Sequence, residues 1–176
     1  MTRILINSVG LNSDQIAGLA GIDIIKAGYK LHYCKGEYFS LSQSLTKKLI
    51  YPVPKPNQGG LGIHVTPDWQ GGIRLGPNAH YVDEIDYKVD KKRKQEFYSS
   101  VKKILPFIEY DELEPDFAGI RPKLQGQGED FRDFVISHEY DKGLEGFINL
   151  IGIESPGLTA SPAIAKYVRT MVDEIW

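Results

Sequence analysis

The sequence predicts an α+β fold: a mixed, largely antiparallel sheet with flanking helices, and partial α/β pieces at both ends of the chain. Three observations support this class. The middle of the chain carries short apolar–polar runs separated by turns rich in Gly and Pro, a pattern typical of antiparallel strands. One helical pattern, at residues 91–105, interrupts these runs. Each end of the chain instead joins one apolar strand to one helix, which is half of an α/β unit.

At the start of the chain, residues 3–7 read as a short buried strand. A turn that ends at Gly10 leads into a helical pattern with Ile16 and Leu19 on one face, and Gly21 could end that helix. A strand that turns at small residues into a helix is half of a nucleotide-binding α/β unit. Only one such unit is present here.

The middle of the chain reads mainly as strands. We expect them at residues 29–40, 49–53, 61–66, 72–75, 117–124 and 131–137. The turn at 67–71 contains Pro, Asp and Gly and predicts a hairpin between its two flanking strands. The helix at 91–105 should bury one face and stop at Pro106. That face consists of Phe97, Val101, Ile104 and Leu105.

The last elements are an apolar strand at 147–152, interrupted only by Asn149, and a helix. The apolar stripe of that helix consists of Ile164, Val168, Val172 and Ile175. Its start is open between two alternatives. Ser155 could cap it with Pro156 in the first turn, or Ser161 could cap it with Pro162 there.

Composition limits the function. With 176 residues, 41% hydrophobic and 25% charged, the chain is expected to form a globular core. Its net charge of −2 argues against nucleic acid or an anionic membrane as partner, and no run approaches the roughly 18 apolar residues of a membrane span. The lone Cys34 cannot form an internal disulfide, and the start of the chain lacks a signal-peptide pattern, so we expect a cytoplasmic protein. The basic run 91–94 should cover a solvated helix face.

Three features could carry chemistry. The Gly152–Ala163 segment places a helix N-terminus beside glycines and could attract an anion, or it could be an ordinary strand–helix connection. Arg121 interrupts an apolar strand, where it could hold a carboxylate or form an internal salt bridge. His64 in mid-strand could transfer protons or be a core histidine with one hydrogen bond. The spacing of the histidines matches no metal site, so we expect no metal.

Several runs, in order along the chain, resemble the D-amino-acid-oxidase-like (DAO) superfamily of FAD-dependent oxidoreductases. They look most similar to its L-2-hydroxyglutarate dehydrogenase/oxidase branch. The runs are residues 35–38 (KGEY), 51–54 (YPVP), 61–66 (LGIHVT), 74–78 (RLGPN), 118–124 (AGIRPKL) and 149–165. One such run would be weak evidence, whereas six in the family's order are specific to the superfamily.

The resemblance implies roles for particular residues. The cofactor would be FAD, contacted by Gly10 near its adenosine side and by the C-terminal segment at the flavin's pyrimidine edge. The residues of that segment are Gly152, Ser155, Gly157, Leu158 and Thr159. Arg121 matches the arginine that holds the substrate carboxylate, with Tyr38 and Lys123 as further substrate contacts. His64 is the candidate base for the substrate hydroxyl proton.

The resemblance also implies three segments and a missing partner. Residues 1–28 would belong to the FAD-binding domain, 29–140 to a sheet-rich substrate domain, and 141–176 to the strand and helix that contact the flavin. These 176 residues contain no Gly-x-Gly-x-x-Gly loop, which in such enzymes lies in an N-terminal FAD-binding half. We therefore expect the isolated chain to bind FAD weakly or not at all and to be inactive.

Two alternatives stay open. The chain could be a non-catalytic folded fragment, or a subunit that needs a partner chain, with an exposed patch that drives self-association. It could also belong to a family member that acts on an amino acid or on glycerol 3-phosphate.

Overall fold

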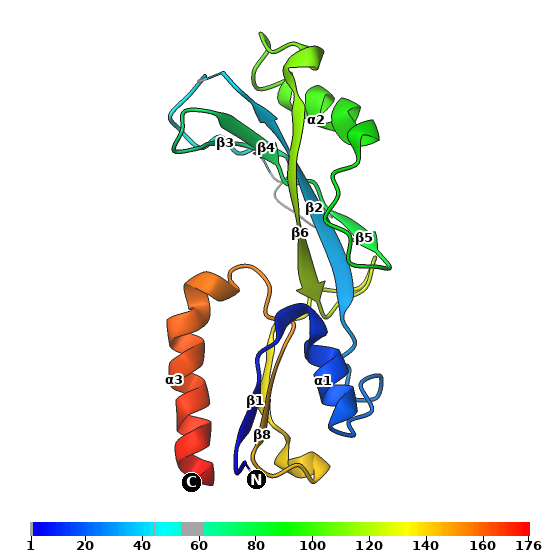
Figure 1. The fold of residues 1–176 in the computed structure, drawn as a ribbon, viewed down its shortest axis with the longest axis vertical. Helices are drawn as coiled ribbons and strands as arrows, with labels where there is room; N and C mark the ends of the chain where they lie inside the picture. The colour runs from blue at the N-terminus through cyan, green and yellow to red at the C-terminus, as the bar shows by residue number, and fades with distance from the viewer. Residues whose placement is uncertain (1, 44, 54–61) are drawn as a thin grey trace. The chain divides into compact units, whose positions relative to one another are not determined.

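The computed structural model describes residues 2–43, 45–53 and 62–176, and these form two compact units (Figure 1). The terminal unit comprises residues 1–33 and 121–176, and the central unit comprises residues 34–120. Both strands and helices are present in the two units, so the predicted α+β class is confirmed. The predicted division into segments 1–28, 29–140 and 141–176 refers to the domains of a complete enzyme, and it stays a prediction.

The terminal unit is built on a three-stranded sheet with the order β1-β8-β7. β1 (Leu5–Asn7) is parallel to β8 (Phe147–Ile151), and β7 (Val135–His138) is antiparallel to β8. In Figure 1, α1 (Ser13–Leu19) and α3 (Gly157–Ile175) flank this sheet. The two end strands and their helices are therefore present as predicted. The predicted burial of residues 3–7 is wrong, because β1 is a short edge strand on which Leu5 and Ile6 are exposed.

A polar chain crosses the interior of the terminal unit and explains the one polar residue of β8. The side-chain amide of Asn149 donates to Glu139 Oε1 at 2.8 Å, and its carbonyl accepts from Asn7 Nδ2 at 2.8 Å. Glu139 is fully buried and pairs with Lys142 Nζ at 2.7 Å. This pair raises the pKa of Lys142. Each of the three buried side chains has at least one partner, although Asn7 Oδ1 has none among the described residues. These contacts favour the observed register of β1 on β8.

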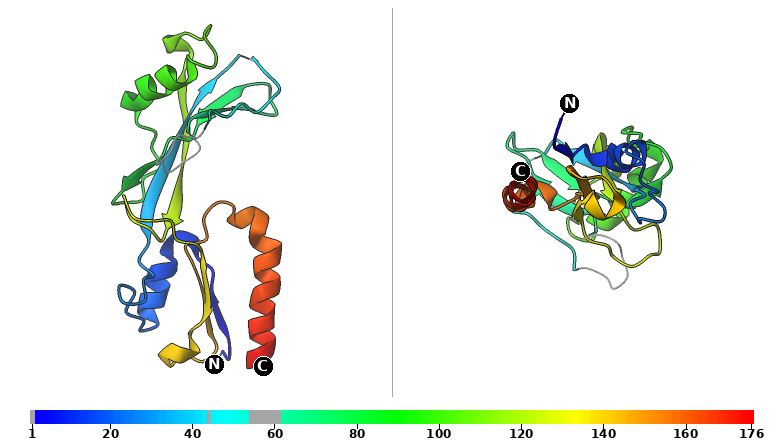
Figure 2. Two further views of the ribbon diagram at one scale, coloured as in Figure 1. Left: turned by 180° about the vertical axis from the view of Figure 1, so that it is seen from behind. Right: turned by 90° about the horizontal axis from the view of Figure 1, so that it is seen from below.

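The central unit contains the sheet order β3-β4-β2-β5, with β6 also paired to β2 (Figure 2). Its strands are β2 (His32–Leu41), β3 (His64–Pro67), β4 (Ile73–Gly76), β5 (His80–Val82) and β6 (Glu114–Lys123). α2 (Lys94–Val101) packs its apolar face on the sheet, where Phe97 meets Phe39 at a ring distance of 4.7 Å. The hairpin predicted around residues 67–71 is the antiparallel pair β3–β4.

Several predicted boundaries are wrong. Residues 49–53 form only one bridge, Ile50 to Val65, and β7 begins at Val135 rather than at residue 131. β5 was not predicted. Leu19 is 84% exposed, because α1 instead buries Ala17 against β8. Residue 61 of the predicted strand at 61–66 lies outside the described residues.

The predicted helix at 91–105 is shorter than expected. A 3₁₀ turn at Lys91–Arg93, capped by Asp90, precedes α2. The predicted face is nevertheless confirmed, since Phe97, Val101 and Leu105 are buried. The basic run is only partly solvated, because Arg93 turns inward to Glu37.

A buried ionic cluster lies under this turn. Glu37 is fully buried and its carboxylate contacts Arg93 Nε at 3.2 Å and Lys35 Nζ at 3.6 Å. The backbone N–H of Asp90 donates to Glu37 at 2.8 Å, and Asn78 Nδ2 lies at 3.4 Å. Glu37 thus joins β2 to the start of the α2 region and neutralises the buried Lys35.

His80 at the edge of this cluster gives the unit a predicted pH dependence. Burial, and then the charge of Arg93, lower the pKa of His80 below its ordinary value of 6.5. The unfolded chain therefore gains a proton on His80 at a pH where the folded chain does not. The free energy of unfolding should then fall as the pH drops below about 6.5. Urea midpoints measured between about pH 7.5 and about pH 5.5 test this.

The matched variant for that measurement is His80→Gln, which cannot titrate in this range. Its urea midpoint should fall less steeply with pH than that of the unmodified chain. Equal slopes for the two proteins would exclude His80 as a source of the pH dependence.

Candidate functional site

The end of β6 presents two cations to one carboxylate. Arg121 and Lys123 are two residues apart on a strand, so their side chains share a face. Glu154, between β8 and α3, receives both: its Oε2 lies 3.4 Å from Arg121 Nη1, and its Oε1 lies 3.0 Å from Lys123 Nζ. The internal salt bridge foreseen for Arg121 is therefore present. The side chain of Arg121 is nevertheless 45% exposed, so the salt bridge leaves it partly accessible.

Gly152 fastens the Glu154 segment onto β6. Its φ of +71° is in the left-handed region, and a Cβ there would lie 2.6 Å from Cγ of Leu124. Only glycine combines this backbone conformation with so close an approach. The absence of a side chain at Gly152 therefore serves internal packing.

α3 begins at Gly157, with Pro156 at the cap position, so neither predicted start is correct. The reason is a turn in which Gly157 N–H donates to the Glu154 carbonyl at 2.5 Å and leads directly into the helix. Pro162 lies inside the helix and cannot donate to the Leu158 carbonyl. Ser161 Oγ donates to that carbonyl instead, at 2.8 Å. The predicted apolar stripe holds, with Val168 buried.

The first turn of α3 is open. The first helical hydrogen bond that follows the turn runs from Ala160 N–H to the Pro156 carbonyl. The N–H groups of Leu158 and Thr159 precede it, so they have no partner within the helix. The Leu158 side chain is 91% exposed, and Ser155 and Thr159 are exposed too. This end can therefore receive an acceptor group, and its dipole favours negative charge.

Gly10 lies in the same unit, at the start of the 3₁₀ turn that links β1 to α1. Its φ is +61°, and a Cβ there would meet no atom within 4 Å among the described residues. Space for a close approach thus exists at Gly10. The side chain of the neighbouring Val9 is 49% exposed.

The other two predicted site residues lie in the central unit. His64 on β3 is partly buried and packs against Tyr51 with the rings tilted and their centres 4.6 Å apart. Its Nδ1 lies 3.2 Å from the Gly62 carbonyl. Tyr38 on β2 stacks on Phe117 with ring centres 4.4 Å apart. The terminal unit groups Arg121, Lys123 and the Gly152–Thr159 segment, which come from distant parts of the sequence.

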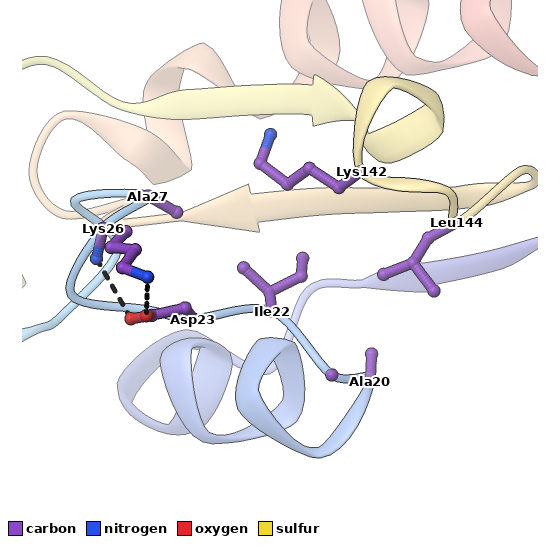
Figure 3. Close-up of a pocket in the computed structure, with 8 residues that line it drawn as sticks. Ala20, Ile22, Asp23, Lys26, Ala27, Lys142 and Leu144 are labelled. Carbon is purple, nitrogen blue, oxygen red and sulfur yellow. Dashed lines mark hydrogen bonds and ion pairs between the residues drawn. The ribbon is translucent and has the colours of Figure 1, made fainter.

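A cavity of about 350 Å³ in the terminal unit contains none of the predicted site residues (Figure 3). Its two lysines have acidic partners: Lys26 pairs with Asp23 at 3.6 Å, and Lys142 pairs with Glu139. The walls are otherwise mostly small or apolar: Ala20, Gly21, Ile22, Ala27 and Leu144. With both cations neutralised, this cavity offers no free charge for a substrate carboxylate.

Glu154 is the site residue that sequence reasoning missed. It lies within the segment assigned to the flavin, but nothing in the spacing distinguishes it from the other acids as the partner of Arg121. Its nearness to Arg121 arises from the packing of Gly152 on Leu124. Among the described residues, no three His, Cys, Asp or Glu side chains gather as metal ligands. No helix in the described ranges is long and apolar enough to cross a membrane.

The chain belongs to the family of FAD-dependent oxidoreductases, whose DAO family model matches residues 1–171. The resemblance seen in the sequence is thereby confirmed. Among curated relatives, L-2-hydroxyglutarate dehydrogenase of Arabidopsis thaliana is 39% identical over 94% of this chain and 37% of its own length. Glycerol 3-phosphate dehydrogenase of Caloramator mitchellensis is 27% identical over 99% of this chain and 34% of its own length.

Solved structures agree on the fold. L-alpha-glycerophosphate oxidase of Mycoplasma pneumoniae, with FAD bound, superposes with a TM-score of 0.71 and 25% identity over 92% of this chain and 40% of its own. Glycine oxidase of Bacillus cereus has a TM-score of 0.67 and 16% identity over 98% of this chain and 43% of its own. The chain thus spans less than half of each of these proteins.

Proposed function

We propose that this chain forms the substrate-binding part, and one wall of the flavin site, of an FAD-dependent oxidoreductase that oxidises a 2-hydroxy acid of the L-2-hydroxyglutarate type. The observation that carries the proposal is the half-exposed Arg121, paired with Glu154 three residues before the open first turn of α3. A carboxylate ligand and a flavin edge would each find the group they need there. The Arabidopsis relative, named for this reaction, supports the choice of substrate.

The groups at the start of α3 fit the cofactor. The N–H groups of Leu158 and Thr159, which have no partner within the helix, would hold an oxygen at the flavin's pyrimidine edge, with Ser155 and Gly157 beside them. FAD, when bound, supplies the acceptor for the substrate's hydride. The positive end of a 19-residue helix would stabilise negative charge at that edge. Gly10 would allow close approach on the adenosine side.

The remaining roles follow from the substrate. Arg121 would hold the carboxylate next to the reacting carbon through two parallel N–H donors, and Lys123 would add positive charge. His64 would take the hydroxyl proton as the hydride leaves the carbon, so that the hydroxyl becomes a carbonyl. Tyr38, stacked on Phe117, would contact the substrate with its ring or hydroxyl.

The Gly-x-Gly-x-x-Gly half would have to accompany this chain for FAD to bind well. We expect a solution of the 176 residues alone to be colourless after purification and to bind added FAD weakly. A stoichiometric flavin spectrum from the isolated chain would contradict this and show that the chain holds FAD unaided. The non-catalytic alternative predicts no turnover even with a flavin-binding half supplied.

The substrate is tested by steady-state kinetics of the complete flavin-loaded enzyme that contains this chain. We expect L-2-hydroxyglutarate to be oxidised with a kcat/KM at least about 100-fold above that of its D-isomer. The reacting carbon carries one hydrogen, and a carboxylate fixed by Arg121 would turn that hydrogen toward the flavin in only one of the two isomers. Equal rates for the two isomers would contradict the proposed binding mode.

A second substrate, glycerol 3-phosphate, is favoured by the relatives and by the FAD-bound structure named for it. An arginine that holds a carboxylate can also hold a phosphate. Turnover of glycerol 3-phosphate, with none of L-2-hydroxyglutarate, would replace the first proposal by this one.

A further inference from the structure

We propose that Glu154 is a positioning residue that holds Arg121 ready for the substrate's carboxylate and ties it to the flavin-facing segment. This inference rests on the proposed function, in which Arg121 binds substrate. It adds a residue to which neither the family resemblance nor the relatives assign a role. The contacts that carry it all lie within the terminal unit.

The two ion pairs of Glu154, one with Lys123 and one with Arg121, differ in burial. The side chain of Lys123 is 12% exposed and that of Glu154 is 7% exposed, and their contact is the shorter one, at 3.0 Å. Arg121 is 45% exposed and contacts Glu154 through one nitrogen only, at 3.4 Å. Lys123 thus holds Glu154 in place, while Glu154 tethers one nitrogen of the half-exposed Arg121 side chain.

The net charge of the Arg121–Glu154–Lys123 cluster suits an anionic ligand. Two cations face one carboxylate, so the cluster keeps one net positive charge. Arg121 has five N–H donors, and its contact with Glu154 uses one nitrogen, Nη1. A substrate carboxylate can therefore bind the exposed edge without displacing Glu154.

Glu154 is itself fixed by its backbone. Its carbonyl accepts from Gly157 N–H at the start of α3, and the nearby Gly152 is packed against Leu124, the residue that follows β6. Any movement of the first turn of α3 would consequently move the tether of Arg121. The residue proposed to hold the substrate and the N–H groups proposed to hold the flavin share one support.

A tether of this kind would act before the substrate arrives. A free arginine side chain samples many rotamers, and ordering it on binding weakens affinity. Glu154 would impose that order in advance, so its loss should raise KM more than it lowers kcat. A purely structural ion pair would instead lower stability and leave KM unchanged in the folded protein.

The tether can be tested on the 176-residue chain without cofactor, by ¹⁵N relaxation of the arginine Nε–H signals. The Arg121 signal is assigned through Arg121→Lys. We expect it to be ordered in the unmodified chain and to become mobile, with an order parameter below about 0.6, in Glu154→Gln. Asp116→Asn, which breaks the 3.0 Å pair with Arg74, is the matched control and should leave Arg121 ordered.

An Arg121 that is already mobile in the unmodified chain, or that stays ordered in Glu154→Gln, would overturn the proposal. If Glu154→Gln does not fold, Glu154→Asp takes its place. Its shorter side chain cannot span both contacts, so either Arg121 becomes mobile, as we expect, or the proposal fails.

Kinetics of the complete enzyme separate this inference from the proposed function. Glu154→Gln should raise KM for the 2-hydroxy acid about tenfold, and Glu154→Asp, whose shorter side chain also releases Arg121, should raise KM as well. If Arg121→Lys changes KM but Glu154→Gln does not, the positioning role fails while the proposed function stands. If Arg121 loses order in Glu154→Gln but Arg121→Lys leaves KM unchanged, the tether stands and the substrate role of Arg121 fails.

Discussion

Replacing Arg121 with Ala should lower kcat/KM for the 2-hydroxy acid about 100-fold in the complete flavin-loaded enzyme, mainly through a higher KM. Truncating one partner of a desolvated, hydrogen-bonded charge pair costs about 2–5 kcal/mol, and about 1.4 kcal/mol corresponds to a factor of ten. The lower part of that range applies because Arg121 is 45% exposed. Steady-state kinetics with L-2-hydroxyglutarate measure the effect.

The control for this variant is Arg169→Ala. Arg169 lies on α3, is 81% exposed, and pairs with Asp173 one turn away. Its loss removes the same charge from the chain without touching β6, so kcat/KM should stay within about twofold of the unmodified enzyme, as exposed pairs of this kind contribute little. A similar loss in both variants would indicate a general charge effect and would remove Arg121 from the substrate site.

Replacing Glu37 with Gln should destabilise the central unit by about 3–5 kcal/mol. Glutamine keeps the shape of the side chain but leaves Lys35, which is 4% exposed, without its buried counter-charge. It also weakens the contacts with Arg93 and with the Asp90 N–H. Asp86, at 3.4 Å from Lys35, can compensate only in part, because its own side chain is 56% exposed. Urea unfolding at neutral pH measures the loss.

Glu96→Gln is the matched control for Glu37. It removes a carboxylate from the same Arg93, but one that is 45% exposed, so the expected change is about 1 kcal/mol or less. The double replacement Lys35→Met with Glu37→Gln should recover part of the stability, since no buried cation then lacks its partner. Equal losses from Glu37→Gln and Glu96→Gln would contradict the buried-ion explanation.

The spacing of apolar residues correctly predicted the features that depend on a single helix or strand. The apolar strand at Phe147–Ile151, the stripe of α3 and the face of α2 all follow from spacing along one element. The short β5 was missed because three residues carry no periodic signal, and it exists only because β2 offers it an edge. Leu19 was placed on the wrong face because packing against β8 selected the smaller Ala17.

In the candidate site too, some features were predicted from the sequence and others depend on tertiary packing. Residue type and order along the chain pointed to Arg121 and to the segment after Gly152, and they left the partner of Arg121 open. That partner is Glu154, 33 residues further on, and only the tertiary packing of β6 on the β8–α3 segment brings it near. The start of α3 was likewise set by the Glu154–Gly157 turn rather than by a capping side chain. The roles of His64, Tyr38 and Lys123 stay predictions.

The most direct test of the central claim is anaerobic reduction of the flavin in the complete enzyme that contains this chain. Addition of L-2-hydroxyglutarate should bleach the visible absorbance of bound FAD in a single turnover. The D-isomer should not, and Arg121→Ala should need a far higher substrate concentration. Flavin that stays oxidised with L-2-hydroxyglutarate, or that Arg121→Ala reduces as readily as the unmodified enzyme, would contradict the account.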